Sequence, residues 1–318
     1  MISPKVLLVC GSMNQTTMMH KISRFLSECD CWFSPYWADG LVDKMARAGW
    51  LDATILGNKR AGWCREYLQA QGLAIDERGS HGYYDLVITS QDLIIQKAIR
   101  KSPIILIQEG MTDPENFLYK FVRTMHLPRY IANTSMTGLS NAYEKFCVAS
   151  EGYKNLFTRK GVDPNKIEVT GIPNWDNAIE FKNNDFPYKG YVLVATSDAR
   201  ETKKHHDRNA FIKRAMEIAG DRQVIFKLHP NENIERATAE IHAIAPQVLV
   251  YSNGNCEYMI ANCDVLITQY STVTYIGLAL GKEVHTELDL DELKILLPEQ
   301  NGGKSAERIA RICQEYIG

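Results

Sequence analysis

Short runs of apolar residues, many of them β-branched, alternate along the chain with longer stretches in which apolar residues recur every three or four positions. Most of the short runs are continuously apolar, which is typical of strands buried on both faces of a parallel sheet. The runs predict strands at Lys5–Cys10, Asp85–Thr89, Pro103–Gln108, Lys145–Ala149, Lys166–Thr170, Tyr191–Ala195, Gln223–Leu228, Val248–Tyr251 and Val265–Thr268.

The stretches between these strands carry the helical period. They predict helices at Thr16–Ser27, Gly152–Lys160, Asn209–Ala219, Ile234–Ile244, Ser271–Leu280 and Lys304–Ile317, with one further strand after Gly281 and Lys282. Repeated strand–helix units indicate an α/β protein built on doubly wound parallel sheets. The polar, turn-rich segment Asn177–Gly190 is the best break between two domains. We therefore expect Rossmann-like domains at 1–180 and 181–303, with a C-terminal helix at 304–318 that packs back on the first domain.

Residues 33–82 show neither period clearly and are rich in glycine and aromatic residues. We expect short helices and loops there. Packing of Trp37, Trp50 and Trp63 in the core is the favoured interpretation, and part of an acceptor pocket is the alternative.

Composition narrows the class of protein. The 318 residues are 45% apolar and 23% charged with a net charge of -2, which is ordinary for a globular protein and gives no reason to expect a nucleic-acid partner. No apolar run approaches the roughly 18 residues of a membrane span, and the first residues lack the pattern of a signal peptide. The eight cysteines lack zinc or thioredoxin spacing. We expect a cytoplasmic protein with reduced thiols and no metal site.

Ligands of parallel α/β sheets collect at the carboxyl ends of the strands, so polar residues that follow strands are the candidates for chemistry. Gly11 and Ser12 follow the first strand, where a tight turn into a helix offers backbone N–H groups to an anion. The turn has neither a GxGxxG pattern nor a Walker lysine, so it is not a dinucleotide or P-loop fingerprint. The alternative role of Ser12 is an ordinary helix cap.

Glu109 follows the strand at Pro103–Gln108 and precedes Gly110. A carboxylate at this position can deprotonate a hydroxyl group or stabilise developing positive charge. The alternative is that it caps the turn Thr112–Pro114.

Two turns in the second half of the chain carry further candidates. Gly171 and Pro173 shape a sharp turn near the expected domain junction. Lys227 ends a strand, and Pro230 then stops the ladder and fixes His229 at the strand end, where it can donate to a phosphate or protonate a leaving group. The alternative for His229 is a structural or solvated side chain.

Hydroxyl and basic residues follow two more strands. Ser271 and Thr272 stand where a helix begins, so their hydroxyls and the free N–H groups suit a phosphate, although an ordinary N-cap is the alternative. The segment Thr196–Arg208 includes Ser197 and Arg200 and is rich in basic residues. We expect a solvated loop near phosphates there.

Several segments that contain these candidates, taken together in their order along the chain, resemble the GT-B clan that contains UDP-N-acetylglucosamine 2-epimerases and CDP-glycerol glycerophosphotransferases. The segments are VTGIPNWD, IFKLHP, VLITQYSTVTYIGLALGKEV and VLVATSDAR in the second half, and VLLVCGSMNQTTMMHKI and PIILIQEGM in the first. The resemblance implies a GT-B fold, with two Rossmann-like domains facing a cleft.

The resemblance also implies roles for single residues. His229 would contact the donor phosphates, Ser271 and Thr272 would hold the pyrophosphate, Lys227 would add positive charge, and Glu109 would face the transferred group.

The sequence departs from both enzyme patterns. The histidine of the transferase HG element is replaced by Glu109, and the aspartate of its DYSS element by Gln269. The epimerase Gly-Gly-x-x-Glu-Glu element is absent, since Thr272–Ile276 contains no acid. An acid before glycine also resembles some bacterial Kdo transferases, which use CMP-activated donors.

We accordingly expect a metal-independent glycosyltransferase of bacterial surface-polysaccharide synthesis. It would transfer a sugar or polyol phosphate from a UDP, CDP or CMP donor to a glycan or lipid-linked acceptor, without a separate cofactor. Glu109 would be the base of an inverting reaction or the nucleophile of a retaining one.

The alternatives are a nucleotide-sugar 2-epimerase, a CMP-Kdo-type transferase and a non-catalytic binding protein. The segment Phe117–Arg129 mixes aromatic and basic residues. It predicts either peripheral contact with the inner face of the cytoplasmic membrane or a partly buried helix. The oligomeric state stays open.

Overall fold

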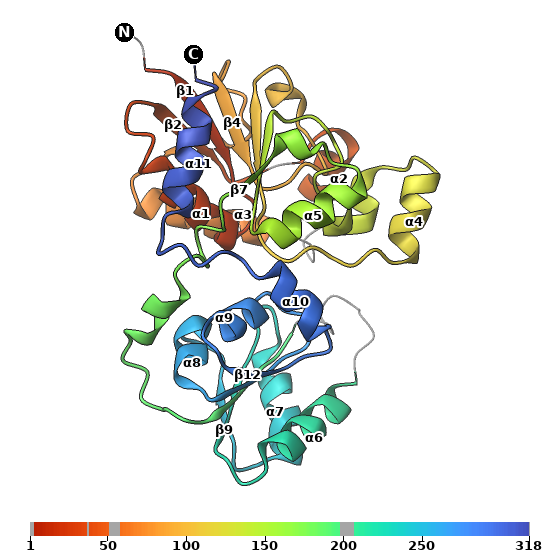
Figure 1. The fold of residues 1–318 in the computed structure, drawn as a ribbon, viewed down its shortest axis with the longest axis vertical. Coiled ribbons are helices and arrows are strands. Elements are labelled where there is room, and N and C mark those ends of the chain that lie inside the picture. The colour runs from red at the N-terminus through yellow and green to blue at the C-terminus, as the bar shows by residue number, and fades with distance from the viewer. Residues whose placement is uncertain (1–2, 37, 51–57, 198–206, 318) are drawn as a thin grey trace. The chain divides into compact units, whose positions relative to one another are not determined.

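The computed structural model describes residues 3–36, 38–50, 58–197 and 207–317. The chain divides into two compact units (Figure 1). The N-terminal unit comprises Met1–Asp176 with Pro298–Gly318, and the second unit comprises Asn177–Leu297. The sequence placed the corresponding boundaries at 180 and 303.

The N-terminal unit contains a seven-stranded parallel sheet in the order β3-β2-β1-β4-β5-β6-β7. Its strands are β1 (Lys5–Val9), β2 (Asp30–Ser34), β3 (Ala74–Ile75), β4 (Leu86–Thr89), β5 (Ile104–Ile107), β6 (Lys145–Val148) and β7 (Ile167–Val169). Its α-helices are α1 (Met13–Ser23), α2 (Gly40–Arg47), α3 (Asn58–Ala70), α4 (Phe117–Thr124), α5 (Glu151–Lys160) and α11 (Ser305–Gln314). Short 3₁₀ segments are η1 (Lys97–Ile99), η2 (Arg129–Met136) and η3 (Pro164–Lys166). The C-terminal helix α11 packs against α1.

The second unit contains a five-stranded parallel sheet in the order β10-β9-β8-β11-β12. Its strands are β8 (Val192–Ala195), β9 (Val224–Lys227), β10 (Leu249–Tyr251), β11 (Val265–Ile267) and β12 (Glu283–His285). Its helices are η4 (Ala178–Lys182), α6 (Arg208–Ala219), α7 (Ile234–Ile244), α8 (Cys256–Asn262), α9 (Val273–Ala279) and α10 (Leu290–Leu296).

The continuously apolar runs are the buried strands. Every residue of β4, β5, β8 and β9 is buried, as expected for strands covered on both faces. The α/β prediction with two doubly wound parallel sheets is therefore confirmed.

Each sheet has one point where the strand order reverses. In the N-terminal unit the chain adds β2 and β3 on one side of β1 and then returns to add β4 to β7 on the other. In the second unit the reversal lies between β8 and β11. The loops that leave the carboxyl ends of two such strands diverge and leave a crevice, which is where open α/β sheets bind ligands.

The tryptophans of residues 33–82 differ from the expectation. Trp50 is 74% exposed and Trp63 is 37% exposed, so neither is a core residue. Trp37 lies outside the described residues. All eight cysteines are unpaired. In the described part of the chain, no helix has the length and apolar character needed to cross a bilayer.

Candidate functional site

The carboxylate of Glu109 is held by three side chains from the start of α1. Its Oε1 accepts hydrogen bonds from Ser12 Oγ at 2.9 Å and from Asn14 Nδ2 at 3.4 Å. Its Oε2 accepts one from Gln15 Nε2 at 2.5 Å. Glu109 follows β5, one strand away from the switch point between β1 and β4. These contacts with α1 differ from the alternative role, in which the carboxylate capped the turn 112–114.

Ser12 has two structural roles in this arrangement. Its Oγ donates to Glu109 and also accepts from the backbone N–H of Gln15 at 3.1 Å, so it is the N-cap of α1. A Ser N-cap satisfies one of the free N–H groups of the first turn. The same cap therefore fixes the end of α1 and the direction of the Glu109 side chain.

The turn 171–174 is tied to the same helix. Asn174 Nδ2 donates to Asn14 Oδ1 at 2.8 Å, and Lys21 Nζ donates to the Pro173 carbonyl at 2.7 Å. Gly171 has a φ of +81°, and a Cβ there would lie 2.4 Å from Ser305 Oγ, so only glycine fits. Glu109, the start of α1 and this turn form one connected polar cluster, which we call the Glu109 cluster.

Sequence reasoning found Glu109, Ser12, Gly171 and Pro173 but missed Asn14, Gln15 and Asn174. The signal for Asn14 and Gln15 was present, because two amides follow the cap in the first turn of a helix at a strand end. Asn174 could not be paired in advance, since it lies 160 residues from its partner.

Lys227 and His229 stand at the end of β9 in the second unit, as the sequence predicted. Lys227 is 6% exposed, and its Nζ donates to the carbonyls of Leu228 at 2.9 Å and Ser252 at 3.0 Å. Burial lowers the pKa of Lys227. Two of the three ammonium protons thus have protein partners, which makes Lys227 a structural link as well as a candidate phosphate ligand.

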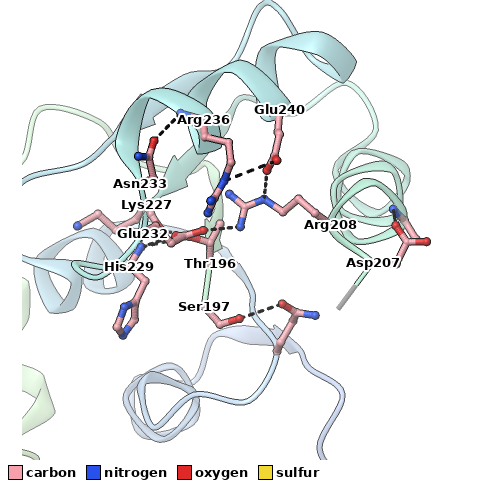
Figure 2. A network of polar contacts seen from close by, with 12 residues as sticks. Thr196, Ser197, Asp207, Arg208, Lys227, His229, Glu232, Asn233, Arg236 and Glu240 are labelled. Atoms are coloured by element: carbon pink, nitrogen blue, oxygen red, sulfur yellow. Dashed lines mark hydrogen bonds and ion pairs between the residues drawn. The ribbon is translucent and has the colours of Figure 1, made fainter. Parts of the chain in front are cut away.

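The His229 ring is oriented by its own turn. Its Nδ1 accepts from the backbone N–H of Asn231 at 3.2 Å, which places the proton of the neutral ring on Nε2. The His229 backbone N–H donates to Glu232 Oε2 at 2.8 Å. Figure 2 shows the imidazole pointing away from the guanidinium of Arg208. A protonated Nε2 is the donor that contact with a phosphate oxygen needs.

Behind His229 lies a buried ion pair that sequence reasoning missed. Arg208 Nη1 lies 2.5 Å from Glu232 Oε1, and the side chains are 9% and 3% exposed (Figure 2). Thr196 Oγ1 donates to Glu232 Oε2. Arg208 Nε also lies 4.0 Å from Glu240. The pair joins the start of α6 to the β9–α7 turn and so fixes the turn that carries His229.

The switch point of the second unit is bridged by Ser197, whose Oγ donates to Gln269 Oε1 at 3.3 Å. Ser197 follows β8 and Gln269 follows β11, so the contact joins the two diverging loops. Thr268 is 2% exposed, and its Oγ1 has no hydrogen-bond partner within the described residues. Arg200, which the sequence placed beside phosphates, lies outside those residues.

Ser271 and Thr272 precede α9. Thr272 is the N-cap residue but makes no side-chain cap hydrogen bond, and Ser271 Oγ accepts from the Val273 N–H only at 3.4 Å. The first turn of α9 contains no acidic residue. The weak capping leaves both predicted roles of these hydroxyls open, phosphate binding and an ordinary N-cap.

A hollow of about 320 Å³ lies beside α6 at the carboxyl ends of β11 and β12. Its lining residues include Phe211, Ile267, Arg214, Gln269 and Glu287. None of the expected phosphate-binding residues is among the described residues that line it. Across the described residues there is also no group of three or more His, Cys, Asp or Glu that could hold a metal ion.

No family model matches the chain, and no curated protein matches it. Its structure is similar to that of UDP-GlcNAc 2-epimerase from Methanocaldococcus jannaschii, solved with UDP-GlcNAc and UDP. The two are 15% identical, the match covers 98% of this chain and 99% of that chain, and the TM-score is 0.60.

Two further solved structures are similar. MnaA of S. aureus, solved with UDP, is 11% identical, with 99% and 97% of the two chains covered and a TM-score of 0.63. The wall teichoic acid polymerase TagF is 12% identical, with 99% and 88% covered and a TM-score of 0.52. At these identities the comparisons establish the fold alone: the chain has a GT-B-like two-domain α/β fold.

Proposed function

We propose that this chain is an enzyme that acts on a nucleotide-activated sugar, with Glu109 as its acid–base group. The observation that carries the proposal is the Glu109 carboxylate, fixed at the carboxyl end of its sheet by Ser12, Asn14 and Gln15. A catalytic base has to be held in a defined position relative to the proton it removes.

The nucleotide is assigned to the second unit. There the oriented His229 ring, the weakly capped start of α9 at Ser271 and Thr272, and Ser197 at the switch point all follow carboxyl ends of strands. Hydroxyl groups, an N–H donor and a helix start are suited to phosphate oxygens. Lys227 adds positive charge at the end of β9, and Arg200 is proposed as a further phosphate ligand.

Epimerisation at C2 of a UDP-sugar is the leading reaction, ahead of the transfer that the sequence placed first. The support is the likeness to 2-epimerases from several organisms, which extends over nearly the full length of both chains. Inversion at C2 requires removal and return of the C2 proton. The electron pair of the C2–H bond would form a C1=C2 double bond as UDP leaves C1, and UDP would add back to C1 when a proton returns to the other face of C2. A fixed carboxylate such as Glu109 suits the proton transfer.

Transfer to an acceptor is the second candidate, and two observations favour it. The first turn of α9 lacks the acids of the epimerase Gly-Gly-x-x-Glu-Glu element, and TagF, a polymerase, shares the fold. In this reaction Glu109 would remove the proton of an acceptor hydroxyl. The acceptor would be a glycan or a lipid-linked glycan, and the donor would carry UDP, CDP or CMP.

One product analysis separates the two reactions. The protein is incubated with UDP-GlcNAc alone and the products are followed by NMR. The proposal predicts a 2-epimer from the donor alone. If a glycoside forms, and only after a glycan acceptor is added, the reaction is transfer and the proposal of epimerisation is wrong.

A thermal-shift screen with UDP, CMP, CDP and GDP tests the nucleotide assignment in parallel. A nucleotide that binds the folded state raises its Tm by mass action, and at a hundred times Kd the stabilisation is about 2.7 kcal/mol. We expect a shift with UDP. The absence of a shift with all four nucleotides would contradict the nucleotide assignment.

A further inference from the structure

Helix α4 has two apolar faces, and only one of them is covered by the protein. Tyr119 and Val122 are buried against residues of η2, including Ala132 and Met136. The other face carries Phe117, Phe121 and Met125, spaced four residues apart and 82%, 44% and 58% exposed. Residues at i, i+4 and i+8 lie along one stripe of a helix.

Further apolar side chains of α4 and η2 are exposed as well. Leu118, Tyr130 and Ile131 are about as exposed as Phe121, and the rings of Phe117 and Phe121 stack with centroids 6.3 Å apart. We call Phe117, Leu118, Phe121, Met125, Tyr130 and Ile131 the α4 surface. In Figure 1 helix α4 lies at the outer edge of the N-terminal unit, away from the β1–β7 sheet. Clusters of exposed large apolar side chains are typical of interaction sites.

The charge around this surface is mainly basic, with Asp113 and Glu115 as the acids that directly precede α4. Residues 116–143 contain no Asp or Glu, while Lys120, Arg123 and Arg129 are basic. Lys120 and Arg123 are exposed and alternate with the apolar stripe along α4. A helix with exposed aromatic residues among basic ones suits the interface of a bilayer that carries anionic lipids.

We propose that the α4 surface binds an anionic lipid bilayer. Helix α4 would lie in the plane of the interface, with Phe117, Phe121 and Met125 among the acyl chains and Lys120 and Arg123 at the headgroups. A second copy of the chain is the less favoured occupant, because a two-fold contact would place basic surfaces of the same sign against each other. The inference does not depend on the proposed function.

The test is co-sedimentation of the full chain with vesicles of phosphatidylcholine, with or without 30 mol% phosphatidylglycerol. We expect binding to the anionic vesicles that weakens with added salt. Phe117→Ser/Phe121→Ser should reduce partitioning by about tenfold or more, since each ring would leave the interface. The matched control is Phe25→Ser/Tyr83→Ser, which removes two exposed aromatic rings elsewhere in the same unit and should bind as the wild type does.

Circular dichroism and Tm establish that the variants are folded. Equal binding by Phe117→Ser/Phe121→Ser and the wild type would overturn the proposal, as would no binding to anionic vesicles. A wild-type dimer that this variant converts to a monomer, without vesicle binding, would assign the surface to a second copy instead. The donor-only epimerisation assay uses soluble substrate, so failure here leaves the proposed function standing.

Discussion

At the scale of single residues, the side chains expected to bind ligand also hold the protein together. Ser12 caps α1 while it positions Glu109, and Lys227 joins the ends of β9 and β10 through two carbonyls. A substitution at such a residue changes stability as well as binding. The two effects therefore have to be measured separately.

Lys227→Met tests this double role. The substitution leaves the carbonyls of Leu228 and Ser252 without their donor, and an unsatisfied buried polar group costs about 1–3 kcal/mol. We expect a loss of that size in the free energy of unfolding in urea. Lys213→Met, at an exposed position on α6, is the matched control and should change it little; equal losses would contradict the structural role of Lys227.

The pH dependence of the same pair of proteins follows from the lowered pKa of Lys227. Burial disfavours the charged form in the folded state, so the unfolded chain binds more protons between the two pKa values. The stability that Lys227 contributes should therefore rise with pH through the alkaline range between the folded and unfolded pKa. Urea unfolding at several pH values should show that the free energy of unfolding of the wild type, minus that of Lys227→Met, increases as the pH rises. A decrease of this difference with pH would contradict the predicted sign.

At the scale of secondary-structure elements, a buried ion pair connects three loops of the second unit. Arg208 begins α6, Glu232 lies in the β9–α7 turn, and Thr196 follows β8. Removing one partner of a buried pair leaves an uncompensated charge, whereas replacing both can be neutral.

Glu232→Gln should lower the free energy of unfolding by about 3–5 kcal/mol, because Arg208 loses the nearer of its two anionic partners, with only Glu240 left at 4.0 Å. Arg208→Met/Glu232→Gln should be less destabilised than Glu232→Gln alone, which a double-mutant cycle measures. Glu307→Gln breaks the exposed pair with Arg311 on α11 and should cost about 0.5 kcal/mol or less. Additive effects in the cycle would show that Arg208 and Glu232 are not coupled.

The elements that the sequence predicted correctly are those with a continuous apolar pattern. The strand signals at 5–10, 85–89, 103–108 and 191–195 correspond to β1, β4, β5 and β8. Strand β2 was missed because only two of its five residues are buried, and β3 because it has two residues. The buried ion pair was missed because its partners are 24 residues apart, and no local period encodes that distance.

At the scale of the whole molecule, the chain consists of two parallel-sheet units, each with its own switch point and its own set of polar residues at carboxyl strand ends. The Glu109 cluster belongs to the first unit, and His229, Ser271 and Thr272 belong to the second. In the proposed function the first set supplies the acid–base group and the second set supplies the contacts with the nucleotide. Glu109 is therefore the residue whose removal should separate catalysis from nucleotide binding.

The most direct test of the account is turnover of UDP-GlcNAc in deuterated water by Glu109→Gln, with binding of UDP measured on the same sample. The wild type should form the 2-epimer and incorporate deuterium at C2. Glu109→Gln should lose about 10²- to 10⁴-fold in rate while its Kd for UDP is unchanged. Glu144→Gln removes an exposed carboxylate of the same unit and should behave as the wild type. Turnover by Glu109→Gln at the wild-type rate would contradict the central claim.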